Sequence, residues 1–306
     1  MLLSKRQFIP QPLLSYFKTL PAPIKGIALA LASNALFVTV GALVRVLSES
    51  IDVFQILFFR QLVFVILLLP SILVNLDVLM KPKMVKLHLL RVAGAFVALY
   101  FGYLTVSNIP FADATAIGFT KVIFVAIISR LFLTESVGLS RFVMVAVGFV
   151  GVMLVVQPSM SQASEGYILI GLIGALGAAV AVICVRKMAA TEPRVAVLTY
   201  QAISVGIIAL IPSLLSWQWP TMYEFTLLIL VGVISSIAQW LGVTAYKWGE
   251  ANIIANVEYS QMIYSLALGY WLFTEIPNSL AIVGVSIIVA SALIPYALKY
   301  WEKQIR

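Results

Sequence analysis

Long apolar stretches follow one another along almost the whole chain, separated only by short polar or proline-containing segments. A helix needs about 20 consecutive, mostly apolar residues to cross a bilayer, and ten stretches of about this length lie between the breaks. The sequence therefore predicts an all-α polytopic membrane protein with ten transmembrane helices. These helices are expected at residues 26–46, 53–74, 87–106, 112–133, 140–157, 166–185, 195–215, 224–246, 251–273 and 279–299.

The composition excludes most soluble classes of protein. Hydrophobic residues make up 62% of the 306 residues and charged residues 10%, against roughly 45–50% and about 25% in soluble domains. Cys184 and His88 are the single cysteine and the single histidine, and we place His88 in a basic cytoplasmic loop. No catalytic Ser-His-Asp or Cys-His group and no Cys-based or His-rich metal site is recognisable around them. We therefore expect no enzyme, no cofactor, no metal and no nucleic acid as a partner.

Basic residues gather at alternate ends of the predicted helices. If the N-terminus is cytoplasmic, every lysine and arginine lies at a cytoplasmic end except Arg45, which is outside, and Arg60 and Lys121, which lie within helices. Cytoplasmic loops of membrane proteins carry an excess of lysine and arginine. We therefore predict that residues 1–23 and 300–306 are cytoplasmic tails. The surrounding lipid bilayer is expected to be a bacterial-type cytoplasmic (inner) membrane.

The two halves of the chain resemble each other at a constant offset. The sequence LFLTE at 131–135 matches WLFTE at 271–275, and LLPSIL at 68–73 matches LIPSLL at 210–215. Each half holds five predicted helices, an odd number, so the second half must enter the membrane from the opposite side. Such an inverted-topology repeat is typical of secondary transporters. The two repeats are predicted to cover residues 24–158 and 159–299.

Several motifs in this arrangement resemble a known family. The fourth helix of each half closes on LFLTE at Glu135 or LFTE at Glu275, the sequence IPFADATAI occupies residues 109–117, and FFR occupies residues 58–60. The chain after its first 23 residues resembles the EamA family of the drug/metabolite transporter superfamily. This resemblance implies a carrier for small organic solutes, often an exporter of amino acids or metabolites. It also implies a cavity between the halves, lined chiefly by helices 1, 3, 4, 6, 8 and 9.

The sequence departs from the family pattern in two helices. Members commonly have a proline midway along the fourth and ninth helices, near the positions where this chain has Lys121 and Gln261. No substrate is therefore transferred from a better-known member. The glutamates that close the fourth helices, Glu135 and Glu275, are expected to act as structural anchors at the membrane boundary.

Polar side chains inside the predicted helices are the candidate site residues, because each is costly in a bilayer unless it is paired or faces a cavity. A single asparagine or glutamine is explained about as well by an interhelical hydrogen bond as by contact with a substrate. We assign Arg60 a structural role, either reaching outward or pairing with Asp52 or Glu49. The candidate substrate-binding residues are Asn34, Tyr100, Tyr103, Lys121, Gln239, Trp240, Glu258, Gln261 and Tyr264.

Lys121 and Glu258 are expected to lie at similar depths in the membrane. Lys121 lies roughly 14 Å along its helix from the outside and Glu258 roughly 11 Å along its helix from the inside, at 1.5 Å per residue. In a hydrocarbon core about 30 Å thick, the two Cα atoms are then only about 5 Å apart along the membrane normal. We predict that they pair with each other or with a substrate. A permanent structural ion pair is one reading, and competition for the pair by a substrate or proton is the other.

These observations favour a secondary active transporter for small organic metabolites that works by alternating access. Export is one of the two directions in which it could work. Lys121 supplies a positive charge, which favours amino-acid-like, zwitterionic or anionic solutes. Protons or a counter-substrate are the expected energy source, and a monomer or a weak dimer the expected assembly. The alternatives are a membrane-embedded lipid-modifying enzyme and a channel.

Within the sixth helix, the glycines at 171, 174 and 177 are expected to form a close-packing face.

Overall fold

The computed structural model describes most of the chain. The tails are largely excluded, and Glu135 and Glu275 with their predicted anchoring role also lie outside the described residues. The ninth and tenth predicted helices are described only in part. The described residues are 20–109, 111–133, 139–157, 165–250, 253–254, 257–264, 267 and 278–291.

Helices joined by short turns make up the described chain, and strands are absent from it. The first eight predicted helices agree with the observed ones to within a few residues. The additional short helix α4 was not predicted. The observed helices are α2 (Ala22–Leu47), α3 (Val53–Val74), α4 (Leu76–Leu79), α5 (Val85–Asn108), α6 (Phe111–Phe132), α7 (Leu139–Val156), α8 (Glu165–Met188), α9 (Arg194–Leu215) and α10 (Met222–Trp248).

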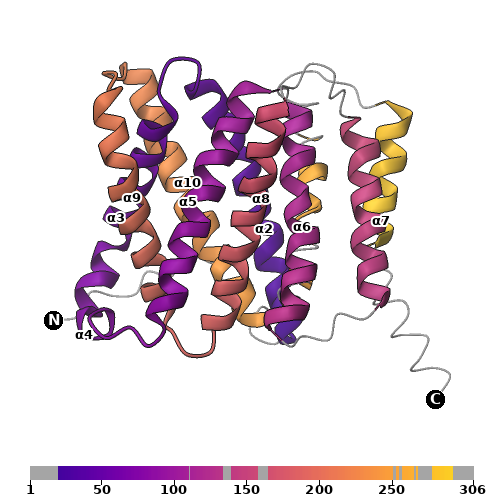
Figure 1. Cartoon of the computed structure of the whole chain (residues 1–306), viewed down its shortest axis with the longest axis horizontal. Coiled ribbons are helices and arrows are strands. Elements are labelled where there is room, and N and C mark those ends of the chain that lie inside the picture. Colours follow the sequence, from indigo (N-terminus) through magenta and orange to yellow (C-terminus); the bar gives the residue numbers. More distant parts are fainter. Residues whose placement is uncertain are drawn as a thin grey trace.

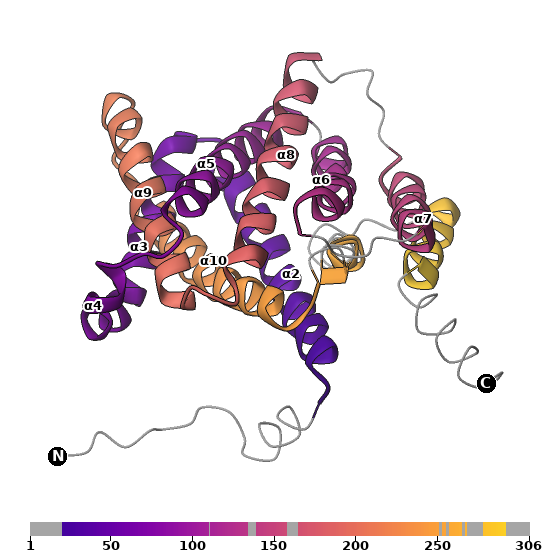
Figure 2. The same cartoon turned by 60° about the horizontal axis from the view of Figure 1, so that its bottom comes forward.

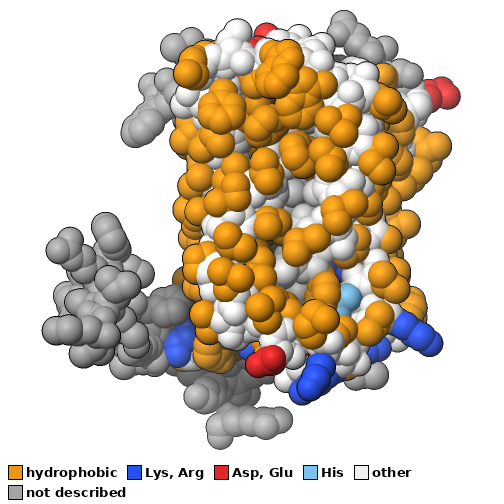
Figure 3. Space-filling model, turned by 90° about the vertical axis from the view of Figure 1, so that its left-hand side faces the viewer, with side chains coloured by type: hydrophobic (Ala, Val, Ile, Leu, Met, Phe, Trp, Pro, Cys, Tyr) orange, Lys and Arg blue, Asp and Glu red, His pale blue; other side chains and the backbone are white. Residues whose placement is uncertain are grey.

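Six of the described helices are long and apolar enough to cross a membrane, namely α2, α3, α5, α8, α9 and α10. Hydrophobic side chains cover the middle of the molecule in Figure 3, whereas Lys and Arg side chains gather at its lower end. An apolar band on the face in view suits the hydrocarbon core of a bilayer. The chain is therefore an integral membrane protein. We call the lysine-rich end the basic end; its exposed lysines include Lys81, Lys83, Lys86 and Lys187.

The helices run up and down through one bundle (Figures 1 and 2). The most extensive contacts join α5 to α8, α2 to α10 and α3 to α9, and α6 packs on α8. At one side of the bundle α7 lies against residues 278–291, where a Cβ on Gly151 would meet the Ile288 side chain at 2.8 Å. Every one of these contacts joins segments far apart in the sequence.

Small residues allow α5 and α8 to approach closely. A Cβ added to Gly171 would lie 2.7 Å from the Ile117 side chain of α6, and one added to Gly177 would lie 2.9 Å from the carbonyl oxygen of Gly94 on α5. Gly174 faces Phe101 of α5 at 3.3 Å. The glycines of α8 thus form the predicted close-packing face, which serves two neighbouring helices.

Candidate functional site

An ion pair joins α6 to the segment that follows α10. Lys121 of α6 pairs with Glu258, and the hydroxyl of Tyr246 on α10 donates to Glu258 Oε1 at 3.2 Å. The side chains of Lys121 and Glu258 are only 21% and 12% exposed. A lone charge at the middle of a bilayer costs at least ~2.5 kcal/mol on insertion scales, a cost that pairing offsets. Of the two partners predicted for these charges, each other or a substrate, the structure shows the first.

A second polar contact lies three residues further along the same segment. The side-chain amide of Gln261 donates to Asn34 Oδ1 on α2 at 3.2 Å. In turn, Asn34 Nδ2 donates to the carbonyl oxygen of Val257 at 3.1 Å and to the hydroxyl of Ser260 at 3.2 Å. The amide of Asn34 is therefore fully engaged with this segment. Tyr264, also a candidate, lies half-buried on it.

A third polar group connects four helices. Gln239 of α10 accepts from Arg60 Nη2 of α3 at 3.4 Å and donates to Gln201 Oε1 of α9 at 2.9 Å. The same oxygen of Gln201 accepts from Arg91 Nη2 of α5 at 3.1 Å. We call these residues, Arg60, Gln239, Gln201 and Arg91, the arginine–glutamine chain.

The position and the partners expected for the Arg60 side chain were wrong. Arg60 is 2% exposed, so it does not reach outward, and its described partner is Gln239 rather than Asp52 or Glu49. Asp52 instead caps α3 by accepting from the backbone N–H of Phe54 at 2.9 Å. A buried arginine without a carboxylate is unusual because of its desolvation cost.

Sequence reasoning also missed Arg91 and Gln201. Arg91 was assigned to the cytoplasmic end of its helix, but α5 begins at Val85, and Arg91 is buried at 2% exposure. Its position more than one turn inside an apolar helix was the signal available in the sequence. Gln201 is 1% exposed and was overlooked as one amide among several.

The aromatic candidates lie among apolar residues or at the surface. Tyr100 stacks on Phe54 with ring centroids 4.1 Å apart, and Tyr103 packs half-buried in the apolar contacts of α5. Trp240 is 44% exposed, with the guanidinium of Arg194 5.1 Å from its ring centroid. These three side chains are not joined to the polar groups above by any described hydrogen bond.

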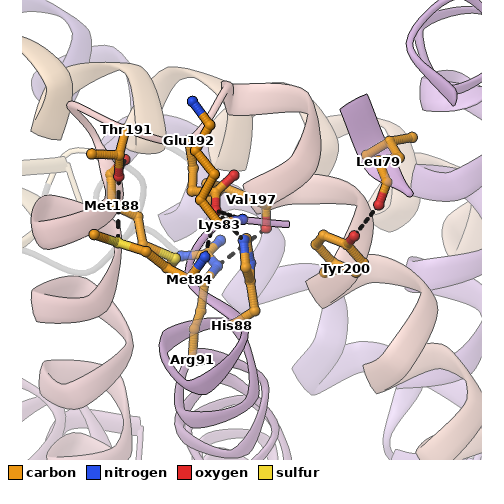
Figure 4. Close-up of polar contacts among 10 residues, drawn as sticks. All are labelled: Leu79, Lys83, Met84, His88, Arg91, Met188, Thr191, Glu192, Val197 and Tyr200. Atoms are coloured by element: carbon orange, nitrogen blue, oxygen red, sulfur yellow. Dashed lines mark hydrogen bonds and ion pairs between the residues drawn. The ribbon is translucent and has the colours of Figure 1, made fainter. Parts of the chain in front are cut away.

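His88 lies in the first turn of α5 and not in a loop, which corrects its predicted position. It is buried, its Nε2 lies 3.5 Å from Glu192 Oε1, and its ring packs against Tyr200 (Figure 4). The Glu192 carboxylate also accepts from the backbone N–H groups of Lys83 and Met84 at 2.7 and 2.9 Å. Glu192, in the turn between α8 and α9, thereby holds the N-terminus of α5 at the basic end.

A comparable set of contacts lies at the opposite end of the bundle. Gln55 of α3 donates to the carbonyl oxygen of Gln218 at 2.7 Å and accepts from its N–H at 3.0 Å. Ser50 donates to the carboxylate of Glu224 at the start of α10. At both ends of the bundle, polar groups of one helix end therefore form hydrogen bonds with loop residues that lie far away in the sequence.

The described part of the chain offers no group of three His, Cys, Asp or Glu side chains that could hold a metal ion. Its chemistry is instead that of paired charges, amides and guanidinium groups. Such groups bind and release polar solutes, and they provide no nucleophile with an adjacent base.

The sequence model of the EamA-like transporter family matches this chain twice, over residues 24–157 and again over residues 165–296. The sequence is 27% identical over 273 residues to the pseudopaline exporter CntI of Pseudomonas aeruginosa, covering 88% of this chain and 94% of that protein. It is 26% identical over 249 residues to the S-adenosylmethionine uptake transporter of Rickettsia bellii, covering 81% of this chain and 85% of that protein.

The fold is also similar to that of a solved structure. One crystal structure of a protein superposes on this chain with a TM-score of 0.75 and covers 90% of this chain and 96% of its own. At 17% sequence identity this likeness concerns the fold alone.

Proposed function

This chain belongs to the EamA-like transporter family, and from this premise we propose that it is a secondary active transporter of small organic metabolites that works by alternating access. The family and the named relatives are transporters, not enzymes. One relative is named for export of pseudopaline and another for uptake of S-adenosylmethionine. Both are small molecules, and their opposite directions leave export and uptake as alternatives for this chain.

The observation that carries the proposal is the ion pair between Lys121 and Glu258. Each residue lies in a different one of the two family matches, so the pair crosses between the halves of the chain. Because each charge is costly without its partner, the pair holds the halves together until another ion replaces one partner. A substrate carboxylate can replace Glu258, and a proton can neutralise it. We propose that this competition couples binding to the change of state.

In this proposal the chain forms ten helices in two inverted five-helix repeats, residues 24–158 and 159–299. The two family matches and the packing support the repeat. The third helix of the first half, α5, packs on the first helix of the second half, α8. The third helix of the second half, α10, packs in the same way on the first helix of the first half, α2. Two exchangeable half-structures are what alternating access requires.

The proposed solutes are amino-acid-like, zwitterionic or anionic, and the proposed site lies between the halves. Proton or counter-substrate coupling supplies the energy. The basic end faces the cytoplasm of a bacterial-type inner membrane, and the protein acts as a monomer or a weak dimer. The proposed substrate-binding residues are Asn34, Tyr100, Tyr103, Lys121, Gln239, Trp240, Glu258, Gln261 and Tyr264.

The test is counterflow in proteoliposomes that contain the purified full-length protein. A panel of radiolabelled amino acids, organic acids, nucleosides and vitamins is offered outside vesicles loaded with the same unlabelled solute. Saturable counterflow of at least one solute is expected. Its absence across the panel, or single-channel conductance in planar bilayers, contradicts a carrier.

The ion pair is tested in the same vesicles with Lys121→Met and Glu258→Gln. Each variant is expected to abolish coupled uptake while remaining a folded monomer by size-exclusion chromatography. The matched controls Lys187→Met and Glu165→Gln remove exposed charges at the two ends of α8 and are expected to transport at the parental rate. If Lys121→Met and Glu258→Gln both transport at the parental rate, the proposed role of the pair is refuted.

A further inference from the structure

Among the described residues, two arginines buried inside the bundle have no carboxylate partner. Arg60 on α3 and Arg91 on α5 are each 2% exposed, and the described side chains that accept hydrogen bonds from them are those of Gln239 and Gln201. Taking a guanidinium out of water costs several kcal/mol unless an opposite charge compensates it. This part of the bundle therefore holds two positive charges that no described carboxylate neutralises.

Amide oxygens occupy the positions where a counter-ion would bind. Gln239 Oε1 accepts from Arg60, and Gln201 Oε1 accepts from Arg91. Gln239 Nε2 donates to Gln201 Oε1, so the two guanidinium groups belong to one hydrogen-bonded chain. An amide oxygen carries only a partial negative charge. It satisfies the geometry of an arginine donor but leaves the charge uncompensated.

Donor capacity in this region is also left unused. Arg60 Nη1 is buried and has no hydrogen-bond partner. The next side chain, Gln61, is 1% exposed, and neither its oxygen nor its nitrogen has a partner. The guanidinium fork donates two parallel hydrogen bonds to a carboxylate, whereas Gln239 uses only one of them at 3.4 Å.

Lys121 is a weaker candidate for binding an anion. Its charge is already neutralised by Glu258, whereas Arg60 and Arg91 have no such partner among the described residues. The positive charge that an anionic solute can bind without first breaking an ion pair therefore lies on the arginines of α3 and α5.

We propose that Arg60 and Arg91 bind the carboxylate groups of the transported solute, displacing the amide oxygens of Gln239 and Gln201. The substrate class is then a small organic acid or amino acid with at least one carboxylate. This inference rests on the proposed transport function and adds the identity of the anion-binding groups. Because both arginines are buried, the solute reaches them only after the bundle opens.

The first test needs no ligand and measures thermal unfolding of the detergent-purified protein. Arg60→Gln and Arg91→Gln each remove an uncompensated buried charge and are expected to unfold at or above the parental temperature. Arg45→Gln, an exposed arginine of α2, is the control for a change of arginine to glutamine on a helix. Unfolding of both test variants well below this control indicates a structural role and overturns the inference.

The second test measures stabilisation by succinate, in the absence of other carboxylates, with the uncharged succinamide as its shape-matched control. Ligands that bind only the folded state raise its apparent stability. Millimolar succinate is expected to raise the unfolding temperature of the parent and of Arg45→Gln by about 2–4 °C. Succinamide is expected to have no effect, and Arg60→Gln and Arg91→Gln are expected to lose the response to succinate.

Two outcomes overturn this inference, namely no succinate response in the parent, or an undiminished response in both arginine variants. Counterflow in proteoliposomes separates them from a failure of the proposed function. If the parental protein shows counterflow and both arginine variants keep the response to succinate, the proposed transport function stands and the arginine site is refuted. If the parental protein shows no counterflow, the proposed transport function is refuted, whether or not the protein binds succinate.

Discussion

Gly94 of α5 and Gly177 of α8 lie directly against each other's backbone. A Cβ on Gly94 would lie 2.7 Å from the carbonyl oxygen of Gly177, and a Cβ on Gly177 would lie 2.9 Å from the carbonyl oxygen of Gly94. Backbone atoms within helices cannot turn aside as a flexible side chain can. The separation of α5 and α8 is therefore set by these two residues, as small residues set helix separation in other membrane proteins.

Replacing Gly94 by alanine is expected to destabilise the protein by about 1–3 kcal/mol, the usual cost of overpacking. Gly102→Ala on the same helix is the matched control, because a Cβ there meets nothing within 4 Å. The control is expected to be neutral or stabilising by roughly 0.5–1 kcal/mol, since alanine favours helix more than glycine does. Thermal unfolding in detergent measures both, and equal unfolding temperatures would contradict the close contact.

Replacing Glu192 by alanine is expected to loosen the N-terminus of α5. The carboxylate accepts from two backbone N–H groups there, those of Lys83 and Met84, and loss of such a cap costs about 0.5–2 kcal/mol. Hydrogen exchange of a peptide covering residues 80–90 is expected to become faster. Exchange of residues 94–108, further along the same helix, is expected to stay at the parental rate.

Unchanged exchange at residues 80–90 in Glu192→Ala would show that the cap is not needed to hold this helix end. A control at the same turn is Thr191→Ala, since the Thr191 hydroxyl contacts Met84 Sδ and the Met188 carbonyl oxygen. It leaves the two N–H contacts of Glu192 in place and is expected to exchange like the parent.

Replacing Thr221 by alanine is expected to weaken the start of α10 by about 0.5–2 kcal/mol. Thr221 and Glu224 form a capping box in which each side chain binds the other's backbone N–H, so two otherwise unpaired donors are satisfied. Thr226→Ala is the control, because its hydroxyl only returns to the Met222 carbonyl oxygen within the helix. Chemical or thermal unfolding compares the two, and a larger loss in Thr226→Ala would argue against the cap.

Cys184 is expected to resist alkylation in the folded protein. Its side chain is 2% exposed within the main apolar cluster, so a maleimide cannot reach the sulfur without local opening. Mass spectrometry is expected to find no adduct in mild detergent and complete modification after unfolding in sodium dodecyl sulfate. Rapid labelling of the folded protein would show that the Cys184 side chain is more accessible than its burial in the structure predicts.

Hydropathy alone was enough to predict the first eight long helices and the positions of the charged residues along them. In a bilayer every backbone polar group must be satisfied within the segment, so an apolar stretch of about 20 residues has to be helical. Observed helices such as α3 and α9 therefore match the predicted spans closely. The similar depths expected for Lys121 and Glu258 followed from the same counting, and they led to the prediction that these residues pair with each other or with a substrate.

Only the tertiary structure decided which faces of the helices meet. A membrane helix is apolar on all sides, so its sequence does not mark the packed face as the polar stripe of a soluble helix does. The contact of α5 with α8 and the burial of His88 could not be read from hydropathy for this reason. The same holds for Arg60 and Arg91, which each lie more than one turn inside an apolar helix. Only the packing of α9 and α10 beside them decided that both are enclosed by the bundle and share a chain of glutamine amides.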